Sequence, residues 1–282
     1  MAGGADLSLE TAGLDHPVER GMHWFSRAAC AAPGVPGPRV FDRTRGATGR
    51  SIDHFQKGRY TDIGVRRSVF GGILSAYPAL RLVASGLAVR RGPRFLFKDL
   101  GLDLKAGEVM QLTGPNGSGK STLLRLLAGF SPADSGMIRM EGLEDSERGG
   151  AIHYFGHREG LRAALTAHEN LAFLAGLLGG EATRISNALS RLGISRLEHL
   201  PVRVLSEGQR RRVALARLIV IDRPVWLLDE PLASLDKDAI GMVSDLISEH
   251  ASRGGMAIVA THQTLAARTT TLDLAGRREA AA

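Results

Sequence analysis

One loop narrows the possible folds of this 282-residue chain more than any other segment: Gly114-Pro115-Asn116-Gly117-Ser118-Gly119-Lys120-Ser121-Thr122. It fits the pattern G-x-x-x-x-G-K-[ST]. The mostly apolar residues 109–113 before it predict a buried strand, and the leucine-rich run 123–127 after it predicts a helix. A glycine-rich loop between a strand and a helix is typical of phosphate binding, so we interpret residues 114–122 as a phosphate-binding loop.

The residue types in this loop explain the interpretation chemically. Glycines let successive backbone N–H groups turn toward one anion, and the N-terminus of the following helix adds positive potential. We expect Lys120 to reach the β- and γ-phosphates of a nucleotide and Ser121 to bind Mg²⁺. The alternative, a glycine turn that caps an ordinary helix, does not require Lys and Ser at the next two positions.

A second segment places two carboxylates at the end of a buried strand. Residues 225–228 are apolar, and Asp229 and Glu230 follow them directly. Ligands of open α/β sheets bind at the carboxyl ends of the strands. We therefore expect Asp229 to hold Mg²⁺ through water and Glu230 to act as general base toward an attacking water. Taken alone, the pair could equally be two solvated loop acids.

The order of predicted elements indicates an α/β protein with a mainly parallel sheet and flanking helices. Strand patterns occur as short pieces at 82–83 and 87–89 and then at 95–104, 109–113, 225–228 and 257–260. Helical patterns occur after Thr166, which forms a capping box with Glu169, at about 181–192 and at about 239–249. We also expect a small antiparallel β part. The helical stretch within about 150–215 predicts a separate lobe.

The first 79 residues differ from the rest of the chain. They hold 12 of the 35 glycines and no sustained hydrophobic period, so we expect a disordered extension or an upstream segment translated from a misassigned start, followed by one domain at 80–282. Arg66-Arg67-Ser68 resembles a twin-arginine export signal only weakly, because Pro78 and Arg81 interrupt the apolar stretch that should follow.

Composition excludes several classes of protein. Cys30 is the one cysteine, which rules out a disulfide scaffold and a four-thiolate zinc site. No run of about 18 uncharged apolar residues is present, so we expect no membrane-spanning helix. The net charge is +7, but 31 of the 36 basic residues are arginines spread along the chain. This skew resembles a coding bias, and we expect no direct binding of nucleic acid.

Three further motifs resemble those of the ATP-binding-cassette (ABC) ATPases. Leu205-Ser206-Glu207-Gly208-Gln209 resembles the signature of that family, Ser234-Leu235-Asp236 resembles its D-loop, and His262 resembles its switch histidine. Together with the phosphate-binding loop and Asp229-Glu230, these motifs follow in the family's order over residues 80–282. The resemblance implies the P-loop fold of an ABC ATPase, with ATP and Mg²⁺ bound. It also implies a homodimer in which the signature of one copy contacts the γ-phosphate held by the other.

Two departures from the family pattern refine this resemblance. His157 stands where the family usually has glutamine, and the segments 156–161 (G-H-x-x-G-L) and 165–171 (L-T-A-x-E-N-L) resemble the ATP-binding subunits of the cytochrome c maturation haem exporter, the CcmA subfamily. His157 is a possible metal-facing residue. A zinc site with His153 is disfavoured, because that pair would not share a helix face. Arg91 lies where the family often places an adenine-stacking aromatic, and its guanidinium could stack in its place.

The resemblance implies an ATP-hydrolysing motor subunit that lies on the cytoplasmic face of the inner membrane, beside separate membrane-spanning permease subunits. It implies haem handling for cytochrome c maturation, with no direct haem binding by this chain. The alternatives are a soluble ABC ATPase that acts on nucleic acid or ribosomes, and the ATPase subunit of another ABC importer or exporter. Proteins of the first class usually carry two cassettes or long coiled-coil or zinc insertions, and this chain has neither.

Overall fold

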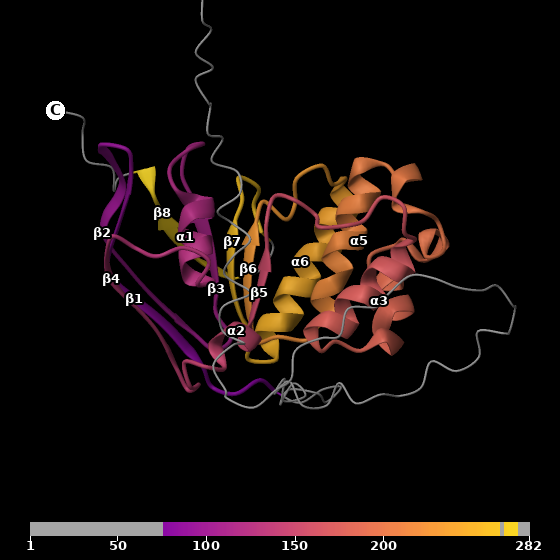
Figure 1. Cartoon of the computed structure of the whole chain (residues 1–282), viewed down its shortest axis with the longest axis horizontal. Coiled ribbons are helices and arrows are strands. Elements are labelled where there is room, and N and C mark those ends of the chain that lie inside the picture. Colours follow the sequence, from indigo (N-terminus) through magenta and orange to yellow (C-terminus); the bar gives the residue numbers. More distant parts are fainter. Residues whose placement is uncertain (1–75, 266–267, 276–282) are drawn as a thin grey trace, which may run out of the picture. The chain divides into compact units, whose positions relative to one another are not determined.

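Parallel strands make up the central sheet of the computed structural model, which describes residues 76–265 and 268–275 (Figure 1). Within these residues the sheet has five strands in the order β5-β6-β7-β3-β8. Every residue of β6 and β7 is buried, as expected for strands covered on both faces. The strands are β3 (Val109–Thr113), β5 (Ile152–Phe155), β6 (Val225–Asp229), β7 (Met256–Ala260) and β8 (Thr269–Asp273).

A smaller antiparallel sheet confirms the second β part predicted from the sequence. Its order is β2-β1-β4, with β1 at Arg81–Arg91, β2 at Arg94–Lys105 and β4 at Ser135–Glu141. The apolar pieces at 82–83 and 87–89 belong to one strand, since β1 continues through register shifts against β2. Alternate residues Leu100, Leu102 and Leu104 are buried, which matches the period of a strand with one covered face.

Helices cover the two faces of the central sheet. In Figure 1, α1 lies between the small sheet and the central sheet, whereas α6, α5 and α3 lie on the other side. The helices are α1 (Lys120–Leu127), α2 (Arg148–Ala151), α3 (Ala167–Leu178), α4 (Ile185–Arg191), α5 (Glu207–Val220) and α6 (Lys237–Ser252), with short 3₁₀ turns at Ala182–Arg184, Ser195–Leu197 and Val202–Val204. The lobe expected over about 150–215 begins after β5, because Ile152–Phe155 pair with β6.

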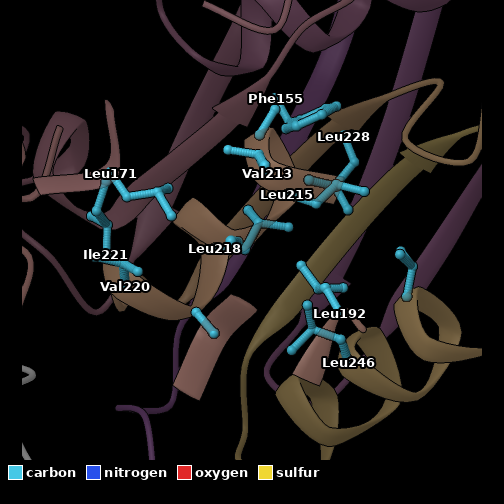
Figure 2. Close-up of a cluster of buried hydrophobic side chains, with 14 of the residues drawn as sticks. Phe155, Leu171, Leu192, Val213, Leu215, Leu218, Val220, Ile221, Leu228 and Leu246 are labelled. Atoms are coloured by element: carbon cyan, nitrogen blue, oxygen red, sulfur yellow. The ribbon is translucent and has the colours of Figure 1, made fainter. Parts of the chain in front are cut away.

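Two hydrophobic clusters lie on opposite faces of the central sheet. One joins the small sheet and α1 to residues such as Leu227 of β6. The other joins α3–α6 to residues such as Leu228, the next residue of the same strand. Figure 2 shows the second cluster, in which Phe155 of β5 and Leu228 lie beside Val213 and Leu215 of α5. Buried packing on both faces fixes the carboxyl ends of β3, β6 and β7.

The folded unit begins before residue 80. Tyr77 is buried, its N–H donates to the carbonyl of Arg253 at 2.8 Å, and its hydroxyl donates to the carboxylate of Asp222. Tyr77 therefore belongs to the domain rather than to the preceding extension. Residues 1–75 of the predicted extension, with the Arg66-Arg67 motif and Cys30, lie outside the described residues. Within those residues, no helix combines the length and apolar character needed to cross a bilayer.

Candidate active site

The glycine-rich loop joins β3 to α1, as predicted, and its backbone conformation requires glycine. Gly114 has φ 136° and Gly119 has φ 101°, in the region that side chains rarely adopt. A Cβ at Gly114 would lie 2.8 Å from the Ser118 hydroxyl oxygen, and one at Gly119 would lie 3.1 Å from the ring of Phe97. Gly119 also precedes α1 without a side-chain cap, so the first N–H groups of the helix remain available to an anion.

Lys120 is the first residue of α1, and its side chain turns back over the loop. Its ammonium donates to the carbonyl of Gly114 at 2.7 Å and lies 3.2 Å from Nε2 of His262. The residue is 8% exposed. A cation held in this position faces the same space as the loop's N–H groups, which suits the phosphates of a nucleotide.

The two predicted carboxylates lie at the end of β6. Asp229 is buried and pairs with Ala260 of β7. Glu230 has φ 49°, its N–H donates to the carbonyl of Ala260 at 2.9 Å, and its Oε1 lies 3.6 Å from Nε2 of His262. The same imidazole nitrogen thus lies beside both Lys120 and Glu230. Lys120, Glu230 and His262, which are distant in the sequence, therefore lie next to one another in the fold.

One cavity of about 240 Å³ brings the predicted nucleotide-binding residues together. Ser121 and Asp229 both line it, and their hydroxyl and carboxylate oxygens are the donor types that Mg²⁺ prefers. This donor set fits the metal expected from the sequence. The lining consists of Arg91, Leu96, Asn116, Gly117, Ser118, Gly119, Lys120, Ser121, Thr122, Asp229 and Glu230. Gly114 and Pro115 are not part of this lining, but their carbonyls accept from Lys120, which is part of it.

A residue that sequence reasoning missed holds the segment with His262 in place. The Gln111 amide on β3 donates to the carbonyls of Thr261, at 3.4 Å, and Gln263, at 3.0 Å. These residues flank His262 directly. Gln111 is a polar residue inside an otherwise apolar strand, and that interruption is the signal that could have identified it.

The predicted signature forms the tip of α5. Ser206 caps the helix by accepting from the Gln209 N–H at 3.2 Å, and the Gln209 side chain accepts from the Ser206 N–H at 2.9 Å. Ser206 is exposed, whereas Leu205 before it is buried in the core. Among the described residues, none of 205–209 lines the cavity of the phosphate-binding loop of the same chain. The chain therefore presents the tip and the loop as two separate surfaces.

The signature contacts the predicted D-loop within one chain. A Cβ at Gly208 would lie 2.7 Å from the carbonyl oxygen of Ser234, so only glycine permits this approach. The Ser234 hydroxyl donates to the Glu207 carboxylate at 2.5 Å. Leu235 packs against the core, and Asp236 caps α6 by accepting from the Ala239 N–H at 2.8 Å. The tip of α5 and residues 234–236 thus form one contiguous unit.

The two histidines considered as a metal pair lie in different environments. His153 is buried in β5, and burial lowers its pKa well below the ordinary histidine value, so the ring is neutral. His157 is exposed in the loop after β5. Together with Glu159 and Arg210 it lines another cavity, of about 640 Å³, separate from that of the phosphate-binding loop. Its carbonyl accepts from Arg211 at 3.3 Å.

Comparisons with known proteins agree with this geometry. The family model described as ABC transporter matches residues 97–233. The cytochrome c biogenesis ATP-binding export protein CcmA of Rhizobium meliloti (strain 1021) is 44% identical over 194 residues, covering 66% of this chain and 93% of that protein. The protein of the same name from Cupriavidus pinatubonensis is 45% identical over 205 residues, covering 71% and 90%.

Solved structures share the fold. A putative ABC transporter ATP-binding protein from Pyrococcus furiosus matches with a TM-score of 0.64 and 23% identity, over 71% of this chain and 100% of that chain. The ATP-binding subunit of another ABC transporter matches with a TM-score of 0.58 and 23% identity, over 64% and 79%.

Proposed function

This chain belongs to the ATP-binding subunits of ABC transporters and, among them, to the CcmA proteins of cytochrome c biogenesis, and from that premise we propose that it drives haem handling by a membrane complex. The observation that carries the catalytic part of the proposal is the meeting of Lys120, Glu230 and His262 beside the phosphate-binding loop. The part concerning haem rests on the resemblance of segments 156–161 and 165–171 to haem-exporter subunits, and the relatives are named for cytochrome c biogenesis and export.

The residues of the cavity, together with His262 beside Lys120 and Glu230, have separate roles in ATP hydrolysis. The loop N–H groups and Lys120 bind the β- and γ-phosphates and offset the charge that develops as the bond to the γ-phosphorus breaks. Glu230 accepts a proton from the attacking water, and His262 contacts the γ-phosphate. Water adds to the γ-phosphorus, the oxygen that bridges the β- and γ-phosphates leaves with ADP, and inorganic phosphate is released. A bound Mg²⁺, held by Ser121 and Asp229, would neutralise phosphate charge.

A second copy of the chain completes each site. Ser206 and Gly208 lie at an exposed helix tip that the phosphate-binding loop of their own chain does not use. The N-terminus of the 14-residue α5 suits a γ-phosphate, since its partial positive charge faces outward. Two chains related by a two-fold axis would each supply a loop and a tip. Hydrolysis removes the phosphate that bridges them, and the pair opens.

The helical lobe transmits this opening to separate membrane-spanning subunits. Its α3 exposes Phe173, at 53%, and Leu177, at 65%, which are large apolar side chains four residues apart on one helix face. In this proposal the chain lies on the cytoplasmic face of the inner membrane, its partners form the pore, and haem is bound by those partners. Arg91 supports the adenine end of ATP from the rim of the same cavity.

Purification of the full chain from membranes in mild detergent tests the assignment. We expect a haem-handling membrane complex to co-purify, and ATP hydrolysis by that complex to disappear in a Lys120→Ala variant that still assembles. Co-purification of ribosomes would overturn the proposal in favour of a soluble ABC ATPase. Co-purification of a different permease would leave the assignment as an ATPase subunit in place, but it would contradict haem as the substrate of the complex.

A further inference from the structure

Arg211 of α5 is a buried cation that contacts the candidate site only through backbone carbonyls. It is 4% exposed, and among the described residues none of the ion pairs includes it. Its guanidinium donates to the carbonyls of Glu230 and of Asp229, the latter at 3.3 Å, and on its other side to the carbonyl of His157 at 3.3 Å. The group also lies 4.5 Å from the centre of the Phe155 ring.

Burying this guanidinium carries a desolvation penalty that has to be offset locally. Burial lowers its pKa, and nearby carboxylates, first Glu159 and then Asp229 and Glu230, act in the opposite direction. Carbonyl oxygens and the face of Phe155 take the place of water around the charge. The guanidinium carries donors on separate nitrogens, so it spans the carbonyls of two segments, whereas the compact ammonium of a lysine reaches less far.

The Glu230 backbone is the part of the site that needs such support. Its φ of 49° is in the left-handed region, and a non-glycine residue stays there only when its surroundings hold it. The N–H of Glu230 is held by the carbonyl of Ala260, and its carbonyl accepts from Arg211 and, at 3.3 Å, from the N–H of Ala233. Without Arg211 the carbonyl keeps only the longer contact within its own turn, so we expect the Glu230 carboxylate to be held less firmly beside His262.

We infer that Arg211 is a positioning residue that fixes the direction of the Glu230 carboxylate and links it to the loop of His157. The inference rests on the proposed function, in which Glu230 is the general base. It connects three elements: the tip of α5, the end of β6 and the loop after β5. A displacement of α5 or of the His157 loop thereby changes how Glu230 faces the attacking water.

Neighbouring arginines do not share this role. Arg210 donates to the carbonyl of Leu205 and lies 3.7 Å from the Glu159 carboxylate. Arg212 donates to the carbonyl of Leu192 in the lobe, at 3.4 Å. Arg212 thus offers a matched control, because it is the next residue of the same helix and also binds a carbonyl, but one remote from Glu230.

The test compares Arg211→Met with Arg212→Met in the full chain, by steady-state ATP hydrolysis. Methionine keeps an apolar stem and removes every donor. We expect Arg211→Met to lower kcat at least about tenfold with KM for ATP changed less than about threefold, because the phosphate-binding loop is untouched. Arg212→Met should keep kcat within about twofold. Amide hydrogen exchange should accelerate at 157–161 and at 229–230 in Arg211→Met only.

Two further variants keep the inference falsifiable. If Arg211→Met does not fold, the Arg211→Lys variant provides the test instead, because lysine keeps the charge but does not bridge both carbonyls. A wild-type kcat in Arg211→Lys would overturn the inference. In a Glu230→Gln background, Arg211→Met should cause no further loss of turnover, because Arg211 acts through Glu230. Undiminished hydrolysis by Glu230→Gln alone would instead contradict the proposed function, whatever Arg211 does.

Discussion

Nε2 of His262 lies 3.2 Å from the Lys120 ammonium and 3.6 Å from the Glu230 carboxylate, so one imidazole separates the cation that binds phosphate from the proposed base. A γ-phosphate in the cavity would compete with His262 for Lys120. The residues at this point were all predicted from local motifs. Their arrangement around a single nitrogen was not predicted, because they come from the start of α1, the residue after β6 and the segment after β7.

Glu230→Gln separates binding from hydrolysis. The amide keeps the size of the side chain but cannot take a proton from water, so we expect ATP affinity to stay within about threefold and kcat to fall at least about 100-fold. Equilibrium binding of ATP and single-turnover hydrolysis by the full chain measure the two quantities. Turnover at the wild-type rate would show that the base is another residue.

His250 makes the stability of the fold depend on pH. Its ring stacks on Trp226 at 3.8 Å, and burial lowers its pKa from 6.5 to about 4. The unfolded chain therefore binds a proton below pH 6.5 that the folded chain does not, and stability decreases as the pH falls from 6.5 toward 4. This histidine alone contributes a slope of up to about 1.4 kcal/mol per pH unit, and buried His153 acts in the same direction.

Urea unfolding of the full chain between pH 7 and pH 5 measures this slope. His250→Phe retains an aromatic ring against Trp226 and removes the titrating group. We expect the unfolding free energy of this variant to depend less steeply on pH. The difference in slope should correspond to about one proton fewer taken up on unfolding. Equal slopes in the variant and the wild-type chain would show that His250 titrates normally in the folded state.

The elements around the site were more predictable than the edges of the sheets. β3 spans the predicted residues, and the capping box of Thr166 starts α3 as expected. A second capping box, that of Ser206 in the predicted signature, starts α5. β8 was missed, since Thr269–Asp273 is mostly polar and pairs with β3 at the edge of the sheet. β4 was missed as well, because most of its residues are not buried and carry no alternating apolar signal.

The contact between α5 and residues 234–236 is an element-level property that sequence spacing could not reveal. Gly208→Ala would place a Cβ 2.7 Å from the Ser234 carbonyl oxygen and so displace the tip of α5 or the D-loop. We expect kcat to fall at least about tenfold, since a small misplacement of a catalytic surface is amplified in rate. ATP hydrolysis by the variant measures this effect.

Gly176→Ala is the control for that substitution. Gly176 lies inside α3 with open space around it, so alanine should raise the unfolding free energy by about 0.5–1 kcal/mol and leave kcat unchanged. Full activity of Gly208→Ala would mean that the tip tolerates displacement. The close contact with Ser234 would then have no part in catalysis.

At the scale of the whole chain, Tyr77 shows where the folded unit begins. Its ring lies 5.1 Å from that of His250 and its hydroxyl binds Asp222, a contact across 145 positions that no local pattern indicates. The sequence predicts the boundary at residue 80, two residues before the first strand pattern. That boundary was drawn from composition and hydrophobic period, neither of which identifies a single aromatic anchor three residues earlier.

Two truncations test this boundary. A chain that starts at residue 76 should keep the ATPase activity and thermal stability of the full chain. A chain that starts at residue 80 should lose about 2–4 kcal/mol of unfolding free energy, because a buried aromatic side chain is removed. Denaturant unfolding of both chains measures the difference. Identical stabilities would show that Tyr77 contributes nothing to the domain.

The division of the site between two copies is the central claim, and complementation tests it directly. Lys120→Ala disables the phosphate-binding loop, and Ser206→Asp keeps the helix cap while placing a negative charge toward the γ-phosphate. Each variant alone should be inactive. An equimolar mixture should recover about a quarter of the wild-type ATPase rate, because half of the dimers are mixed and each mixed dimer holds one complete site. A mixture of folded variants that stays inactive, or a fully active Ser206→Asp chain, would contradict the shared site.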